Sequence, residues 1–135
     1  MNQERRLTHA GSRPGIFLPP GQGRAYHKGG QTGVFKADGD ETGGLYSVSE
    51  WSFEPNTGGL GVHINDDDHV LYVLEGVLSV FMDGTWHRAE RGAFVVIAGG
   101  VRHDFENREP VGVRFLNFNV PGGFEPGIAR AFGAA

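Results

Sequence analysis

Short apolar stretches rich in β-branched and aromatic residues alternate with polar, glycine- and proline-containing turns along most of this chain. The alternation predicts strands at 33–37, 45–53, 58–65, 69–74, 77–82, 85–89, 93–97, 101–106 and 111–120. Asp83-Gly84 is the clearest turn, because this pair tolerates the positive φ angles of a two-residue hairpin. The pattern as a whole predicts an all-β domain, a single antiparallel β-barrel or jelly roll that holds one small ligand in its mouth.

The two ends of the chain lack this alternation. Residues 1–32 combine glycine, proline, arginine and polar residues, which predicts an irregular N-terminal arm with one candidate strand at 15–18. The barrel is predicted at 33–125, and the tail at 126–135 is a candidate for one short helix. We expect the arm to pack on a second subunit.

Composition narrows the classes of function. The 135 residues include no cysteine, which excludes disulfides, thiolate metal sites and a cysteine nucleophile. The formal net charge of −4 argues against nucleic acids and anionic membranes as partners, since both attract concentrated positive charge. No apolar stretch follows Arg5 and Arg6, as it would in a secretory signal, so a cytoplasmic location is expected.

Histidines are the candidate chemistry of the chain. Three of the six lie in the arm or beside a turn and are expected to be solvated and without function: His9, His27 and His87. His63, His69 and His103 lie on predicted strands instead, and strands joined by a short connection run about 5 Å apart. Three imidazoles are a ligand set for Fe, Ni, Mn, Cu or Zn. Spacing alone leaves open that these histidines are merely buried or exposed without a metal.

At these residues the sequence resembles the cupin superfamily. The first cupin motif runs His-x-His, three or four residues, Glu, six residues, Gly, and the corresponding positions here are His63, Asn65, His69 and Gly76. The second runs Gly, five residues, Pro-x-Gly-x-x-His, three residues, Asn, and here it reads Gly92, Ala98, His103 and Asn107. Every spacing fits, and the resemblance covers residues 33–125.

Two departures from the first motif concern the metal ligands. In metal-binding cupins the two motif-one histidines, the Glu and the motif-two His hold the ion. Here Asn65 stands in place of the second His and His69 in place of the Glu. The resemblance therefore implies His63, His69 and His103 as ligands of a divalent transition metal, with Asn65 as a weak or outer ligand. The alternative is a site that has lost its ion and binds an organic ligand alone.

Residues 40–44 and 121–125 are similar to the one-domain cupins related to quercetin dioxygenases. This resemblance implies a metal-dependent, oxygenase-type enzyme acting on a small aromatic or enolisable substrate, in a homodimer. The alternative is a non-enzymatic module that binds or senses a small ligand, with a structural metal or none.

Period-two alternation then suggests which other residues line the pocket. Leu71 and Val73 share a strand face with His69, and Phe105 shares one with His103. Further wall candidates are aromatic: Trp51, Phe53, Phe81, Phe94 and Phe115. Glu50 would serve acid–base chemistry if it points inward, whereas Asn107 is expected to bond the backbone near its turn.

Overall fold

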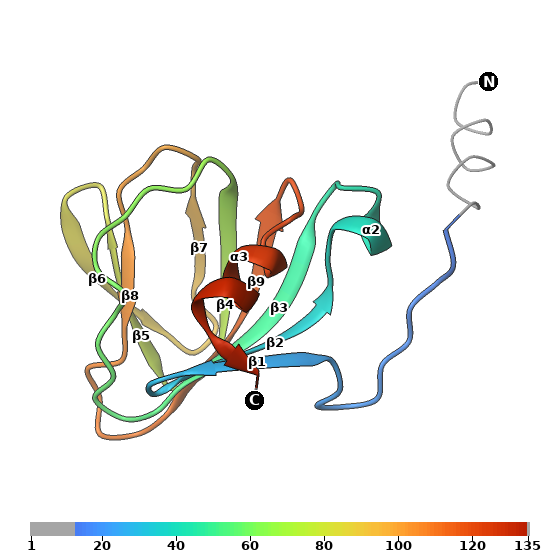
Figure 1. Ribbon diagram of the computed structural model, residues 1–135. Coiled ribbons are helices and arrows are strands. Elements are labelled where there is room, and N and C mark those ends of the chain that lie inside the picture. The colour runs from blue at the N-terminus through green and yellow to red at the C-terminus, as the bar shows by residue number, and fades with distance from the viewer. Residues whose placement is uncertain (1–12, 135) are drawn as a thin grey trace.

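The computed structural model describes residues 13–134, which form ten strands and two short helices (Figure 1). The strands of the larger sheet are β1 (Arg24–Lys28), β2 (Gln31–Ala37), β3 (Ser47–Phe53), β4 (Asp68–Glu75), β7 (Phe94–Ile97), β9 (Val113–Val120) and β10 (Gly133–Ala134). Those of the smaller sheet are β5 (Val77–Met82), β6 (Thr85–Glu90) and β8 (Asp104–Glu106). The helices are α2 (Gly39–Thr42) and α3 (Glu125–Ala131).

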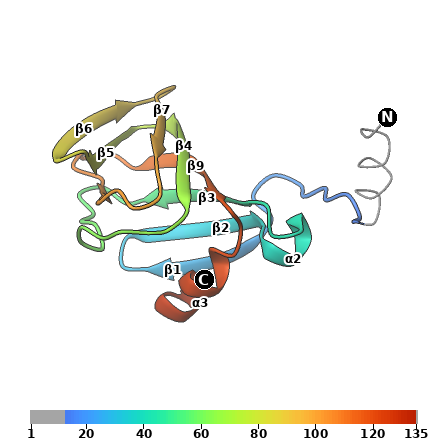
Figure 2. The ribbon, with the colours of Figure 1, turned by 90° about the horizontal axis from the view of Figure 1, so that it is seen from above.

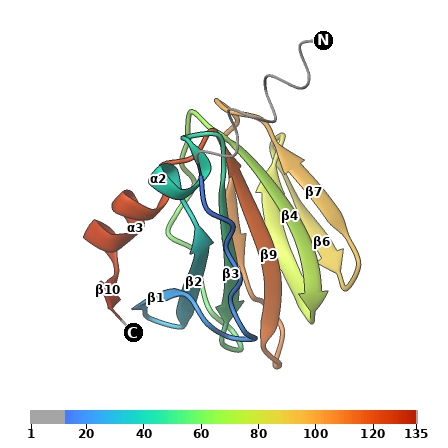
Figure 3. The ribbon, with the colours of Figure 1, turned by 90° about the vertical axis from the view of Figure 1, so that its right-hand side faces the viewer.

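Both sheets are antiparallel throughout. The larger has the order β10-β1-β2-β3-β9-β4-β7, and Figure 3 shows β2, β3, β9 and β4 side by side. The smaller has the order β6-β5-β8. The expected all-β jelly roll is thus confirmed, although strand pairing among the described residues gives two sheets and does not close them into one ring. No helix within residues 13–134 has the length and apolar character needed to cross a bilayer.

Alternation along β3 and β9 decides which side chains face the interior. Every second residue of both strands is buried, and the residues between them are partly exposed. The buried face carries apolar core residues that include Phe35, Leu71 and Phe115. Burying one such side chain completely contributes about 1.5–3 kcal/mol, so this face supplies much of the folding free energy.

Turn chemistry sets the β5–β6 hairpin as predicted. Asp83 and Gly84 have φ angles of 54° and 76°, and Met82 pairs with Thr85 on either side of them. Positive angles at both central residues are typical of a type I′ turn, whose backbone twist matches the twist of the strands.

The N-terminal expectation was wrong in two places. No strand forms at 15–18, whereas residues 24–28, placed in the irregular arm, form β1 and pair with β2. The physical reason is the Gly29-Gly30 pair, which is a two-residue hairpin turn between Lys28 and Gln31. Packing of the arm on a second subunit stays a prediction.

The stretch at 58–65 was also predicted as a strand and is a loop. Its backbone pairs with the rest of the molecule at an isolated bridge between His63 and His103. The loop contains three glycines, which weaken strand formation. The expected C-terminal helix is present as α3, and the chain then returns to pair β10 with β1.

Polar contacts fasten α3 beside β1 and β2 (Figure 2). The Asp38 carboxylate accepts hydrogen bonds from the backbone N–H groups at the start of the helix, among them Gly123 at 2.8 Å. Glu125 accepts from Arg24 Nε at 2.8 Å and from Tyr26 Oη at 2.7 Å. A helix of seven residues is too short to persist alone, so these contacts and its buried apolar side chains hold it in place.

Candidate metal centre and pocket

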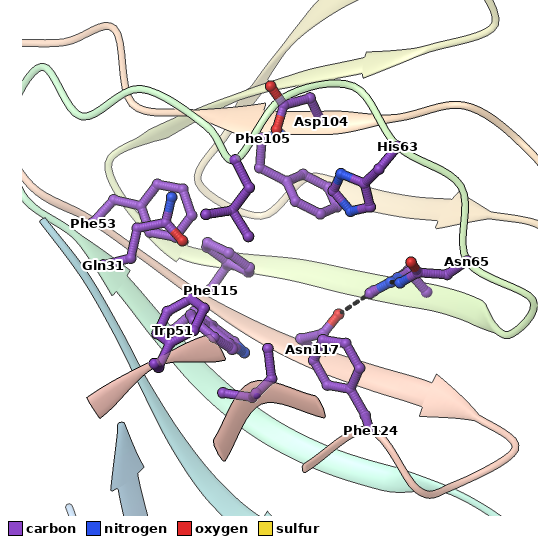
Figure 4. Close-up of a pocket in the computed structure, with 14 residues that line it drawn as sticks. Gln31, Trp51, Phe53, His63, Asn65, Asp104, Phe105, Phe115, Asn117 and Phe124 are labelled. Carbon is purple, nitrogen blue, oxygen red and sulfur yellow. Dashed lines mark hydrogen bonds between the residues drawn. The ribbon is translucent and has the colours of Figure 1, made fainter. Parts of the chain in front are cut away.

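A cavity of about 200 Å³ lies between the inner face of the larger sheet, the 58–65 loop and α3 (Figure 4). Its walls are mostly apolar and aromatic, with polar groups gathered toward one end. The lining residues include Trp51, Phe53 and Phe115 from the sheet, and Ile128 and Phe132 from the C-terminal segment. The cavity is large enough for a small organic molecule, which is what the sequence predicted of this fold.

Strand register brings three histidines to the polar end of this cavity. His69 pairs with Asn119 across β4 and β9 and points inward. His63 and His103 exchange backbone hydrogen bonds of 3.0 and 2.9 Å between the 58–65 loop and the segment before β8. The centroid of the His103 ring lies 4.5 Å from that of His63 and 5.0 Å from that of His69. The three rings proposed from sequence are therefore neighbours.

Each of the three rings has its Nδ1 atom held by an oxygen acceptor. His63 Nδ1 donates to the Gly61 carbonyl at 2.7 Å, and His103 Nδ1 donates to the Val101 carbonyl at 2.9 Å. Carbonyl oxygens only accept, so the neutral ring carries its hydrogen on Nδ1 and its lone pair on Nε2. This arrangement is typical of metal-binding histidines, whose second nitrogen is fixed by an outer partner.

His69 is anchored in the same way by a side chain. Its Nδ1 lies 3.1 Å from Asn117 Oδ1, the contact drawn as a dashed line in Figure 4. Asn117 is held in turn by Asn119, whose Oδ1 accepts from Asn117 Nδ2 at 2.7 Å. Asn119 Nδ2 donates to the Asp67 carboxylate at 2.7 Å. A chain of buried amides therefore fixes the His69 ring.

Burial keeps two of these rings neutral. It lowers the pKa of His69 and of His103 below the ordinary histidine value, because desolvation disfavours the charged imidazolium. A neutral imidazole is the form that binds a metal ion. The polar end thus presents uncharged nitrogen donors near neutral pH.

His103 Nε2 is the atom at this end whose surroundings best fit a bound metal ion. The side chain is 1% exposed, and its Nε2 has no hydrogen-bond partner among the described residues. A buried polar atom without a partner costs about 1–3 kcal/mol, so such atoms are rare in folded proteins. A metal ion that accepts that lone pair would remove this cost.

Asn65 occupies a nitrogen atom of His69 that a metal ion would need. Its Nδ2 lies 2.8 Å from His69 Nε2 and donates to that lone pair. Among the residues that the structure describes, no group of three or more His, Cys, Asp or Glu side chains is arranged to hold a metal ion. The donor types fit a divalent transition metal, but the Asn65 amide has to turn away from His69 before all three Nε2 atoms are available.

Half of the predicted wall residues line the cavity. Trp51, Phe53, Phe105 and Phe115 do so. The other four residues were also expected to line it and do not: Leu71, Val73, Phe81 and Phe94.

Physical reasons for these corrections differ. Leu71 and Val73 point inward but are fully covered by core side chains, so they do not reach the cavity. Phe81 stacks on Trp86 with ring centroids 5.3 Å apart, within the smaller sheet. Phe94 is 66% exposed, because its position on β7 places it on the outer face.

Glu50 also faces away from the cavity. It lies between the buried Ser49 and Trp51, so the alternation of β3 turns it to the outer face. There its carboxylate forms an ion pair with Arg114. An inward acid–base role for Glu50 is therefore wrong.

The remaining predicted polar residues lie outside the cavity. Asn107 donates to the backbone carbonyls of Phe53, Glu54 and Val111, which confirms its expected structural role. The His27 and His87 side chains are exposed, as predicted. His9 lies outside the described residues.

Sequence reasoning missed several cavity residues. Asn117 shares the inward phase of β9 with Phe115, so period-two alternation would have found it. Asp104 is a buried carboxylate that follows His103 directly, and any Cβ at Gly59 would clash with it. Gln31 begins β2, two residues before the predicted strand. Residues from α3 carried no local signal, because only tertiary contacts bring them to the cavity.

Comparisons with known proteins agree with this architecture. An RmlC-like cupin from Shewanella frigidimarina has a TM-score of 0.71 at 19% identity, covering 84% of this chain and 96% of that one. The polyketide cyclase RemF from Streptomyces resistomycificus has a TM-score of 0.61 at 20% identity, covering 78% and 73%. Bacillus subtilis oxalate decarboxylase, a protein with Mn(II) centres, has a TM-score of 0.71 at 14% identity, covering 84% and 31%.

Identities this low show the fold alone. No curated protein matches the sequence. The family model described as the cupin domain, however, matches residues 49–119, more than half of the chain and the stretch that carries all three candidate histidines. The chain therefore belongs to the cupin superfamily.

Proposed function

We propose that this cupin is a metal-dependent enzyme, with an oxygenase-type reaction on a small aromatic or enolisable substrate as its leading chemistry. His63, His69 and His103 would hold a divalent transition metal, with Asn65 at its edge. The observation that carries the proposal is the buried, unpaired Nε2 of His103 beside two further imidazoles. A divalent ion held there would act as a Lewis acid toward an anionic oxygen of the substrate.

The ligand set shapes which substrate the site favours. Three neutral imidazoles leave the full charge of the ion uncompensated, whereas a glutamate at the position of His69 would reduce it. An enolate or carboxylate oxygen is the natural partner for that charge. The aromatic walls opposite would hold a flat ring by stacking and by excluding water.

Asp104 replaces Glu50 as the acid–base candidate. Its carboxylate is buried, lines the cavity and accepts a hydrogen bond from the Phe105 backbone N–H at 2.9 Å. No cation is paired with it among the described residues. A carboxylate in that position can take a proton from a substrate held near the histidines.

Elemental analysis tests the proposal directly. Untagged protein purified without chelator should contain about one equivalent of Fe, Ni, Mn, Cu or Zn. The variant His63→Ala should lose it, while His87→Ala, which removes an exposed histidine, should retain it. Absence of metal from all three proteins, even after reconstitution with each ion, would refute the metal-dependent enzyme.

A second candidate function is a metal-free module that binds a small organic ligand. The hydrogen bond from Asn65 to His69 Nε2 favours it, because that bond occupies a lone pair the metal would need. In this case the protein contains no metal, and small aromatic acids bind with affinities that a chelator does not change.

A further inference from the structure

Gln31 is a polar side chain at the aromatic end of the cavity. It is the first residue of β2, pairs with Phe53 on β3 and is only 6% exposed. Figure 4 shows it beside Phe53 and near Trp51, across the cavity from His63 and Asn65. A buried amide among aromatic rings needs hydrogen-bond partners, because leaving it unpaired costs free energy.

One half of this amide has its partner. Gln31 Nε2 donates to the Gly58 carbonyl at 3.2 Å. A carbonyl can only accept, so this contact fixes which end of the amide is nitrogen. The oxygen, Oε1, is turned toward the cavity in Figure 4, and no donor within residues 13–134 is paired with it. It is accessible from the cavity, because the buried side-chain atom without a partner in these residues is His103 Nε2.

The surrounding side chains cannot supply that donor. The nearby indole N–H of Trp51 donates to Ser49 Oγ at 2.9 Å. The other neighbours at this end are the rings of Phe53, Phe115 and Phe132, which have no donor to offer. Oε1 is therefore an oriented acceptor that a bound molecule would meet.

The register sets how far such a molecule must reach. Ser47 on β3 pairs with Asn119, the partner of His69, whereas Phe53 pairs with Gln31. Ser47 and Phe53 are six residues apart along β3, so the backbones at the two ends of the cavity are roughly 20 Å apart. The side chains that point in from each end shorten the distance that a ligand must span. A molecule with one ring is too short to reach from the histidines to Gln31, whereas a molecule with two fused rings is long enough.

We propose that Gln31 selects substrates that carry a hydroxyl group at the end remote from their anionic oxygen. This inference rests on the proposed function, in which the anionic oxygen binds at the histidine end. The substrate class is then an elongated hydroxylated aromatic acid or enolate. Its anionic oxygen would lie at the histidine end, its rings would lie between the aromatic walls, and its hydroxyl would donate to Gln31 Oε1.

Two probes that differ by one hydroxyl group test the inference. The protein is loaded with Zn²⁺, a redox-inert ion that imidazoles bind, and is titrated with 2-naphthoate and 6-hydroxy-2-naphthoate by calorimetry. The hydroxylated probe should bind about threefold to tenfold more tightly, as one neutral hydrogen bond allows. Equal affinity of the two probes would overturn the inference, and this readout needs no variant.

Gln31→Met assigns the preference to a residue. The substitution removes the acceptor and keeps the length of the side chain, so the preference should disappear while 2-naphthoate binds as before. Gln22→Met makes the same change at an exposed position and should keep the preference. A preference that survives Gln31→Met would contradict the assignment, as would equal losses for both probes, which indicate a structural role.

The same titrations separate this inference from the proposed function. Unchanged binding of 2-naphthoate in the metal-free protein would contradict the metal-anchored site. A hydroxyl preference that still depends on Gln31 would survive that result. Failure of both probes to bind the zinc-loaded protein would overturn both proposals together.

Discussion

The two ends of the cavity are made by the same strands and differ in almost every other respect. At one end β3 and β9 place Ser49 and Asn117 opposite each other, and two residues further along they place Trp51 opposite Phe115. The polar end contains hydrogen-bonded amides and the three imidazoles, of which His103 has a buried Nε2 without a partner in residues 13–134, whereas the aromatic end contains rings in mutual contact with the Gln31 amide beside them. The fold thus derives stability from one end and makes groups available for chemistry at the other.

Phe115→Ala should most weaken the aromatic end. Its ring centroid lies 5.5 Å from that of Phe53 and 6.3 Å from that of Phe105, so truncation leaves a void that the sheet cannot fill. We expect the free energy of unfolding to fall by about 3–5 kcal/mol in chemical denaturation. Phe94→Ala removes an exposed ring and should change it by less than about 0.5 kcal/mol. Similar losses in both variants would show that burial does not distinguish these rings.

The polar end should gain stability only when it binds an ion. Zinc at one hundred times its dissociation constant should raise the unfolding free energy of the wild type by about 2.7 kcal/mol, because it binds the folded state. His103→Ala removes the buried, unpaired Nε2 and should abolish this zinc-dependent gain in thermal denaturation. The exposed variant His87→Ala should retain it. If His103→Ala gained as much stability from zinc as the wild type, His103 would not be a zinc ligand.

Asn117 should affect the ion through His69. Asn117→Leu removes the acceptor for His69 Nδ1, so the ring is free to turn and zinc should bind about 10–100-fold more weakly. Asn117→Asp restores the acceptor for His69 Nδ1 but loses the Nδ2 donor to Asn119, so it should recover part of the lost affinity in a competition titration with a chelator. Equally weak zinc binding by Asn117→Asp and Asn117→Leu would contradict the prediction, because it would show that the acceptor for His69 Nδ1 does not set the zinc affinity.

The difference between the two ends also explains what the sequence could reveal. The aromatic end follows from period two, since Trp51, Phe53 and Phe115 alternate with exposed residues. The same alternation places Glu50 outside, and a stricter use of it would have avoided that error. The same alternation along β9 also predicts that Asn117 points inward, as Phe115 does.

Other features depend on tertiary contacts that no local pattern carries. The three histidines were found through motif spacing, and the structure brings their rings together. The Asn65 contact with His69 Nε2 depends on how a loop of irregular backbone folds over the sheet. The helix α3 is held beside the cavity by residues distant in the chain, among them Arg24 and Asp38.

The smallest expected effect concerns the contacts that hold α3 against the aromatic end. Arg24 donates to Glu41 as well as to Glu125, and its hydrogen bond to Glu41 is the main cause that lowers the pKa of the Glu41 carboxyl. A carboxyl whose pKa is lower in the folded state stabilises the fold above its unfolded pKa and loses that contribution as pH falls through the folded pKa. Glu41 is partly exposed, so solvent limits the effect to less than about 1 kcal/mol.

Acid titration of stability tests this contribution. Between about pH 6 and pH 3 the free energy of unfolding of the wild type should fall more steeply than that of Glu41→Gln, which cannot titrate at this position. The two curves should converge at the acid end, where Glu41 is protonated in both states. Because Asp38 and Glu125 still fasten the start of α3 in the variant, the affinity for 2-naphthoate at neutral pH should stay unchanged. Parallel stability curves would show that the Arg24–Glu41 contact contributes nothing measurable, and that the other contacts alone close this end of the cavity.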